Sequence, residues 1–150
     1  QVMTSTGSGV QWGTAGGTTT QTVLFVNFSD DNSTTSSLRI PYNNLSETSS
    51  NQYYNTFDCP ANGTIKRIRM QNTKGTLSTG FTTIFDIWRN STQTPTQSSS
   101  SLTASSGSIE YEPNLSFSKG DKVMIAYRKS AGSKYWRGVS ASIIIEFTKV

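Results

Sequence analysis

The side chains able to do acid-base or nucleophilic chemistry are few and scattered in this sequence. There is no histidine, which removes the usual general base, the imidazole metal ligands and the serine–histidine and cysteine–histidine nucleophiles. The carboxylates are Asp30, Asp31, Glu47, Asp58, Asp86, Glu110, Glu112, Asp121 and Glu146. They fall on different expected elements, and a glycosidase pair such as Asp86 with Glu146 requires that both strands face one cleft. We therefore expect a protein that is not an enzyme and uses no cofactor.

The sequence also lacks a recognisable motif for binding a metal ion or a phosphate group. The segment NFSDDNS at 27–33 gathers oxygen ligands that calcium accepts, but it lacks the spaced Asp-x-Asp-x-Asp-Gly pattern of a calcium loop. A turn rich in Asn and Asp explains it better. The glycine-rich stretches lie near the N-terminus and not between a strand and a helix, where a phosphate loop would stand. We expect no metal site and no nucleotide chemistry.

Three cations fall within four residues of GTIKRIRMQN at 63–72. Arg67 and Arg69 alternate with apolar Ile68 and Met70, which places the two arginines on one face of a strand. A single-strand or RNA surface would interleave exposed aromatic residues with the cations, and this strand has none. The net charge of +4 also reflects few acids rather than many bases, with 13 Lys and Arg against 9 Asp and Glu. We expect no nucleic-acid partner.

The two arginines then need another explanation. We expect them to lie on a solvated or intersubunit face, with Asp86 and Thr82 of the strand at 81–90 as cross-strand partners.

An aromatic pair beside a cation stands at the expected turn before the last strand, in Tyr135, Trp136 and Arg137. Tyrosine and tryptophan offer large apolar faces at low entropic cost, which suits stacking on a sugar or contact with a receptor protein. The alternative is that Trp136 only covers the open end of the fold. The sequence leaves both readings open.

Val10 and Trp12 are the only anchors in a Gly, Ser and Thr segment at 1–20, which we expect to be a flexible docking arm.

The elements that position these residues are β-strands. Hydrophobic residues make up 33% of the chain and charged residues 15%, the remainder being dominated by Ser, Thr, Asn and Gly, and no window shows helical periodicity. We expect strands at 20–28, 37–42, 52–59, 63–72, 81–90, 108–112, 115–118, 122–129 and 137–150, and a long exposed loop at 91–106. Their number and spacing predict an all-β fold, an antiparallel β-sandwich with a jelly roll of about eight strands over 21–150.

Cys59 is the only cysteine, so no intrachain disulfide can form and a small buried thiol is expected. No apolar run approaches the ~18 residues of a membrane span. We expect a soluble chain with no membrane insertion.

The order of strands and turns over 52–148 resembles a β-sandwich module of tailed-phage virion structural proteins, and also jelly rolls of the tumour-necrosis-factor and complement-head type. The residues that carry the resemblance are Phe57, Pro60–Ile65, Met70, Gly80, Thr82–Arg89, FSKGDKVMIA at 117–126 and Ser142–Phe147. The resemblance implies a virion location, a homotrimer and contacts with other virion proteins. It supplies no catalytic residues.

The resemblance implies a non-enzymatic capsid decoration or fibre-head module that acts by assembly and surface contact. The strands at 81–90 and 121–129 are apolar on more than one face, so we expect part of that surface to be buried between subunits. A receptor- or glycan-binding tip, or a carbohydrate-binding module of a larger protein, is the alternative.

Overall fold

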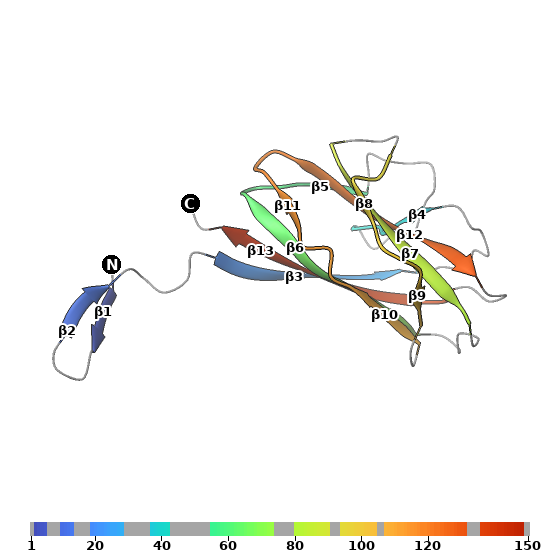
Figure 1. Cartoon of the computed structure of the whole chain (residues 1–150), viewed down its shortest axis with the longest axis horizontal. Helices are drawn as coiled ribbons and strands as arrows, with labels where there is room; N and C mark the ends of the chain where they lie inside the picture. The colour runs from blue at the N-terminus through green and yellow to red at the C-terminus, as the bar shows by residue number, and fades with distance from the viewer. Residues whose placement is uncertain are drawn as a thin grey trace.

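The structure is a computed structural model and contains only β-strands and their connections in the part of the chain that it describes (Figure 1). The described residues are 2–5, 10–13, 19–28, 37–42, 55–73, 80–90, 94–104, 107–131 and 136–148, the first two ranges by backbone alone. Within these ranges there is no helix that could span a membrane.

The segment expected to be a flexible arm contains two strands. β1 (Val2–Ser5) and β2 (Val10–Gly13) pair antiparallel, with Val2 opposite Gly13 and Ser5 opposite Val10. This pairing could not be predicted from the sequence, because four-residue strands within Gly, Ser and Thr carry little hydrophobic periodicity.

One sheet, called the β6 sheet here, is built around the basic strand. In spatial order it consists of β10 (Ser108–Tyr111), β6 (Gly63–Asn72), β13 (Val139–Thr148) and β3 (Thr19–Phe28), and β11 (Leu115–Phe117) also pairs with β6. All pairings are antiparallel. The first long strand therefore lies beside the last, as expected for a jelly roll.

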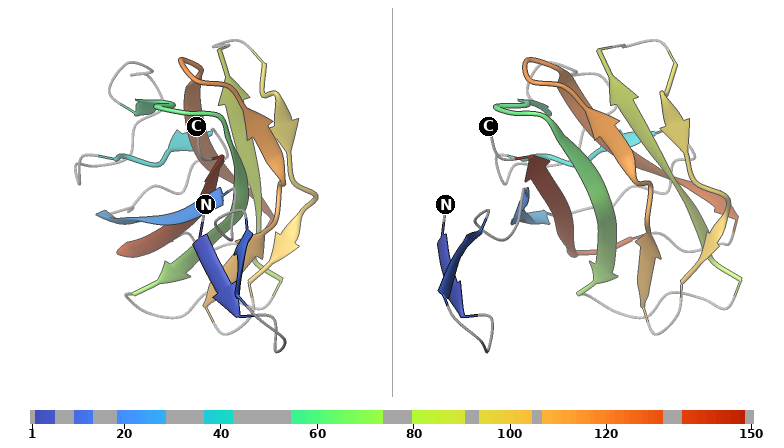
Figure 2. Two further views of the ribbon diagram at one scale, coloured as in Figure 1. Left: turned by 90° about the vertical axis from the view of Figure 1, so that its left-hand side faces the viewer. Right: turned by 60° about the vertical axis from the view of Figure 1, so that its left-hand side comes forward.

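The facing sheet, called the β7 sheet, carries the second half of the core. It consists of β4 (Leu38–Arg39), β12 (Lys122–Ala131), β7 (Thr82–Arg89) and β8 (Gln97–Ser98), while β5 (Thr56–Asp58) pairs with β12 and β9 (Leu102–Thr103) with β7. Figures 1 and 2 show the two sheets packed face to face.

The predicted all-β sandwich is confirmed. β4 and β5 share one neighbour, as do β8 and β9, and β10 and β11, so the described strands of the two sheets occupy eight positions. The segment expected to be a long exposed loop at 91–106 is exposed at most of its described positions, but it also contains two short strands. β8 and β9 pair with β7 there, and Ser99 is buried with its hydroxyl accepting from the Phe85 backbone N–H at 3.0 Å.

The main core lies between the sheets and follows the period of two. Its fully buried members include Ile65, Ile68, Met70, Phe85, Ile87, Ile125 and Ile143. Each such side chain contributes roughly 1.5–3 kcal/mol on transfer from water. Cys59 is buried as expected, and burial raises the pKa of its thiol to about 12.

The opposite face of the β7 sheet is buried as well. Trp88, Met124 and Ala126 form a second apolar cluster, at 6%, 1% and 0% exposure. Their burial is complete within one chain. This apolar face of 81–90 and 121–129 therefore needs no contact between subunits to be buried, and it gives no support to a trimer.

The turn from β11 to β12 explains part of the FSKGDKVMIA motif in structural terms. Asp121 Oδ2 accepts from the Ser118 backbone N–H at 2.8 Å, and Oδ1 accepts from Asn90 Nδ2 at 2.6 Å. Gly120 has φ of +85°, a left-handed conformation that glycine adopts without steric cost, and its N–H donates to the Cys59 carbonyl at 2.8 Å. Asp121 and Gly120 of the motif thus stabilise the turn between β11 and β12.

Stability should depend on pH through Asp121. The hydrogen bonds from Ser118 and Asn90 hold the pKa of its carboxyl below the ordinary value of 3.8. Because the pKa of this carboxyl is lower in the folded chain than in the unfolded chain, ionised Asp121 stabilises the fold at any pH above its unfolded-state pKa. This contribution is lost as the pH falls through its folded-state pKa. Asp121→Asn should therefore be less stable than the natural protein at neutral pH, with a gap that narrows on acidification. Urea midpoints between about pH 5 and pH 2 measure this. Parallel curves at all pH values would contradict it.

Candidate interaction surface

The expected aromatic tip is not a surface for stacking. Trp136 is 2% exposed, its ring lies edge-on to Phe81 with centroids 5.8 Å apart, and Nε1–H donates to Thr83 Oγ1 at 3.0 Å. Of the two readings, the structure shows Trp136 packed into the fold, so its expected role as an exposed contact is wrong. Arg137 is exposed and its backbone N–H donates to Asn72 Oδ1 at 2.6 Å. Tyr135 lies outside the described residues.

The docking residues expected in the arm, Val10 and Trp12, both stand on β2. The structure describes their backbone and not their side chains, so arm docking stays a prediction. Of the segment 27–33, weighed as a calcium loop, only Asn27 and Phe28 are described.

Asp86 and Glu146 do not share a cleft. Asp86 alternates with the core residues Phe85 and Ile87 and so points away from the core on the β7 sheet, while Glu146 faces outward on the β6 sheet. The two carboxylates therefore lie on opposite outer faces of the sandwich, and the glycosidase pair is excluded.

Asp86 is instead the centre of a buried network. Its exposure is 2%, Oδ1 accepts from Ser98 Oγ at 2.6 Å, and Oδ2 accepts from Ser37 Oγ at 3.0 Å and Arg128 Nε at 2.9 Å. These bonds tie β7 to β8 and β12, and to Ser37, which directly precedes β4. The arrangement is structural.

The partners of the basic strand differ from those expected. β6 pairs with β10, β11 and β13, not with the strand that carries Asp86 and Thr82, so those cross-strand partners are wrong. Arg67 instead meets Glu112, whose Oε1 accepts from Nη2 at 2.7 Å and from Nε at 3.1 Å, and Glu110 Oε1 lies 3.4 Å from Nε. The arginine is held in place on an exposed face.

A β-bulge gives the basic strand its unusual surface. Ile144 stands opposite Arg67 while Ile145 stands opposite Ile65, so Lys66 is the extra residue. Lys66 and Arg67 are consecutive, yet neither is buried, whereas Ile65 and Ile68 on either side are fully buried. A bulge of this kind turns two successive side chains toward the same face. Sequence alone gave no sign of it.

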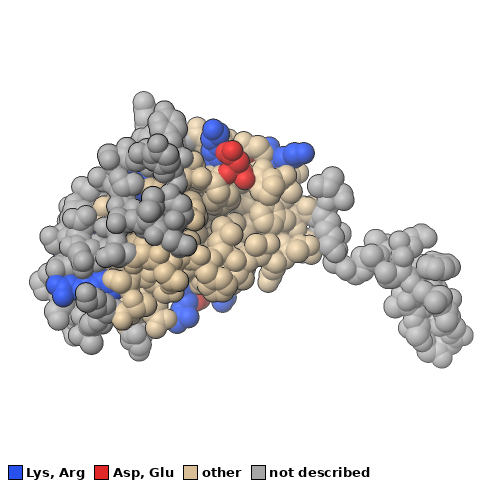
Figure 3. Space-filling view, turned by 180° about the vertical axis from the view of Figure 1, so that it is seen from behind, with Lys and Arg blue, Asp and Glu red and all other residues tan. Residues whose placement is uncertain are grey.

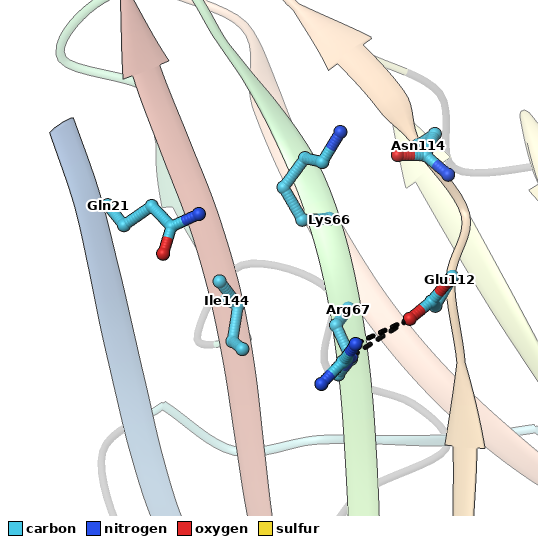
Figure 4. Close-up of a pocket in the computed structure, with 6 residues that line it drawn as sticks. All are labelled: Gln21, Lys66, Arg67, Glu112, Asn114 and Ile144. Atoms are coloured by element: carbon cyan, nitrogen blue, oxygen red, sulfur yellow. Dashed lines mark hydrogen bonds and ion pairs between the residues drawn. The ribbon is translucent and has the colours of Figure 1, made fainter. Parts of the chain in front are cut away.

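The side chains around the bulge enclose a shallow hollow on the outer face of the β6 sheet. It measures about 420 Å³ and is lined by Gln21, Lys66, Arg67, Glu112, Asn114 and Ile144. Figure 4 shows these side chains spread over four neighbouring segments of the face, with the Arg67–Glu112 bonds on one side. Asn114 has φ of 48°, a left-handed conformation that asparagine tolerates better than most residues.

The same outer face carries exposed apolar residues on β3. Phe25 is 74% exposed and Val23 41% exposed, and both alternate with inward-facing neighbours. β3 pairs with β13 on one side and with no other described strand. Its ten residues include no charge, no proline and no bulge, the features that usually protect a sheet edge.

Charges are sparse among the described residues on the side of the molecule seen in Figure 3. The Lys, Arg, Asp and Glu side chains lie mainly along the margin of the described surface, whose middle consists of other residue types. The described residues form no continuous band of cations on this side, the footprint typical of a nucleic-acid binder. The described residues also contain no group of three or more His, Cys, Asp or Glu able to hold a metal ion.

Comparison with known proteins adds no family to this description: no protein-family model and no curated protein sequence matches the chain.

Proposed function

We propose that the chain is a non-enzymatic structural module of a tailed-phage virion, a capsid decoration or fibre-head domain that works by self-assembly and surface contact. The observation that carries the proposal is the exposure of Phe25 on an uncharged edge strand. The virion location and the trimeric order come from the resemblance of residues 52–148 to such modules.

An edge strand of this composition is costly in a free monomer. Phe25 and Val23 together form an apolar strip, and the edge of β3 that pairs with no other described strand offers backbone groups to a chain that can reach it. Association with another copy removes the apolar surface from water and satisfies the edge. Three copies meeting with Phe25 in the contact would form the trimer, and the segment at Val10 and Trp12 would dock on other virion proteins.

The test is the mass in solution by light scattering, compared between the natural protein and Phe25→Glu. We expect the natural chain of 16.4 kDa to form a trimer and Phe25→Glu to lower the mass toward the monomer, since a buried unpaired carboxylate disfavours the contact. Thr103→Glu is the matched control. It adds the same charge at an exposed strand position of the β7 sheet and should leave the mass unchanged.

A natural protein that is monomeric at every concentration would overturn the self-assembly proposal. An oligomer that Phe25→Glu leaves intact would move the contact away from β3. Binding of a host-surface glycan is the second candidate function. Because Trp136 is buried, the observation that favours this function is the hollow at the bulge.

A further inference from the structure

We propose that the hollow on the outer face of the β6 sheet is a binding site for a saccharide that carries a carboxylate, such as a uronic acid residue. Gln21, Lys66, Arg67, Glu112, Asn114 and Ile144 form it. The proposal does not depend on the assembly through Phe25.

The charge of the hollow fits one negative group. Arg67 and Glu112 neutralise each other through the 2.7 Å and 3.1 Å bonds. Lys66 makes no ion pair or hydrogen bond within the described structure, although the bulge turns it to the same face. Among the side chains that line the hollow, one ammonium group is thus left over to bind a carboxylate, and the residue that carries it, Lys66, is only partly exposed.

The other polar groups suit hydroxyls. Both bonds from Arg67 end on Oε1 of Glu112, which leaves Oε2 to accept from a ligand. The side-chain amides of Gln21 and Asn114 have no partner in the described structure, and each can donate and accept. In Figure 4 Asn114 and Lys66 lie toward one end of the hollow, with Gln21 across from them. A ring with several hydroxyls can use such groups together.

The size and floor of the hollow agree with a sugar ring. Its volume of about 420 Å³ lies within the range of small-ligand sites. Ile144, half-buried on β13 between Gln21 and Arg67, supplies an apolar patch for the C–H face of a pyranose.

A phosphate group or a nucleic-acid backbone fits less well. Glu112 lines the hollow, and Glu110, which does not line it, places Oε1 3.4 Å from Arg67 Nε, so two carboxylates stand beside Arg67. They would repel a dianion, and they already occupy Arg67, the group best shaped for bidentate phosphate binding. A monoanion with neutral hydroxyls avoids this repulsion.

The experiment is an NMR titration of the ¹⁵N-labelled protein, in its natural assembly, with glucuronate, glucose and inorganic phosphate at constant ionic strength. We expect glucuronate to bind with a Kd of about 1 mM, as an open site would, and to shift the signals of Lys66, Asn114 and the Gln21 side-chain amide. Glucose should bind about tenfold more weakly, because it lacks the carboxylate.

Lys66→Gln should lower the glucuronate affinity about tenfold and remove the preference over glucose. Arg69→Gln is the matched control, since Arg69 is an exposed cation on the same strand and face and does not line the hollow. Its affinity should be unchanged. The spectrum of each variant reports directly that the fold is retained.

Three outcomes would overturn the proposal. Glucuronate could shift no signal around the hollow, phosphate could bind there at least as tightly as glucuronate, or Arg69→Gln could lose as much affinity as Lys66→Gln. The second would make the hollow a plain anion site, and the third would trace binding to the general charge of β6. A monomer in light scattering leaves all three readouts intact, so failure of the assembly proposal is distinguishable.

Discussion

Trp136→Ala lowers the free energy of unfolding by about 3–5 kcal/mol, the range for removal of a large aromatic side chain from a core. Trp136 is almost fully buried against Phe81, and it is the donor to Thr83 Oγ1 at 3.0 Å. The alanine variant leaves a cavity and an unpaired buried hydroxyl, and both effects destabilise the fold. Urea unfolding monitored by far-ultraviolet circular dichroism measures the change.

Trp136→Phe separates the two effects. Phenylalanine keeps an aromatic ring near Phe81 and loses the hydrogen bond to Thr83, so the loss should be about 1–3 kcal/mol. An alanine variant with an unchanged urea midpoint would show that the tryptophan is at the surface, as the hypothesis of a contact tip requires. The structure predicts the opposite result.

Asp86→Ala is expected to destabilise the protein by about 2–3 kcal/mol. The carboxylate is buried and accepts from Ser37, Ser98 and Arg128, and its removal leaves these donors without their shared acceptor. The expected loss of stability is smaller than for a fully buried ion pair. The Arg128 side chain is 36% exposed, so water can solvate its guanidinium once the carboxylate is gone.

Asp86→Asn is the matched variant for this network. It keeps the shape and one acceptor oxygen while removing the charge, so it should lose about half as much free energy as the alanine variant. Thermal or urea unfolding of both variants at neutral pH gives the comparison. Equal stability of Asp86→Ala and the natural protein would mean that the network contributes nothing.

Strands with one solvent-exposed face could be predicted from the sequence because their side chains alternate in polarity. On β13, Val139, Ala141, Ile143 and Ile145 are all buried, at 0–1% exposure, as the period of two requires. Pro41, two residues after β4, agrees with the edge position of that strand, since proline cannot donate within a sheet. These features depend on neighbours in sequence, and so the sequence shows them.

The errors share a different physical origin. Pairing of β6 with β10 rather than β7 depends on which distant strands meet, and no local pattern encodes that choice. Trp136 lies in a short polar segment that looks exposed, yet its contacts with Phe81 and Thr83 come from residues more than fifty positions away. The bulge at Lys66 likewise exists only relative to β13, so the hollow could not be predicted.

The pairing of Thr19 with Thr148 has a mechanical consequence for whatever the domain is attached to. β3 begins and β13 ends at the same end of the β6 sheet (Figure 1). A pulling force between these two points would separate the strands like a zipper, one hydrogen-bonded pair after another, because the load reaches the rungs in sequence. If the domain is attached to its neighbour through only one of these two points, the pulling force does not act across the hydrogen bonds between β3 and β13. Such an attachment holds the domain by one pole and leaves the far pole facing outward.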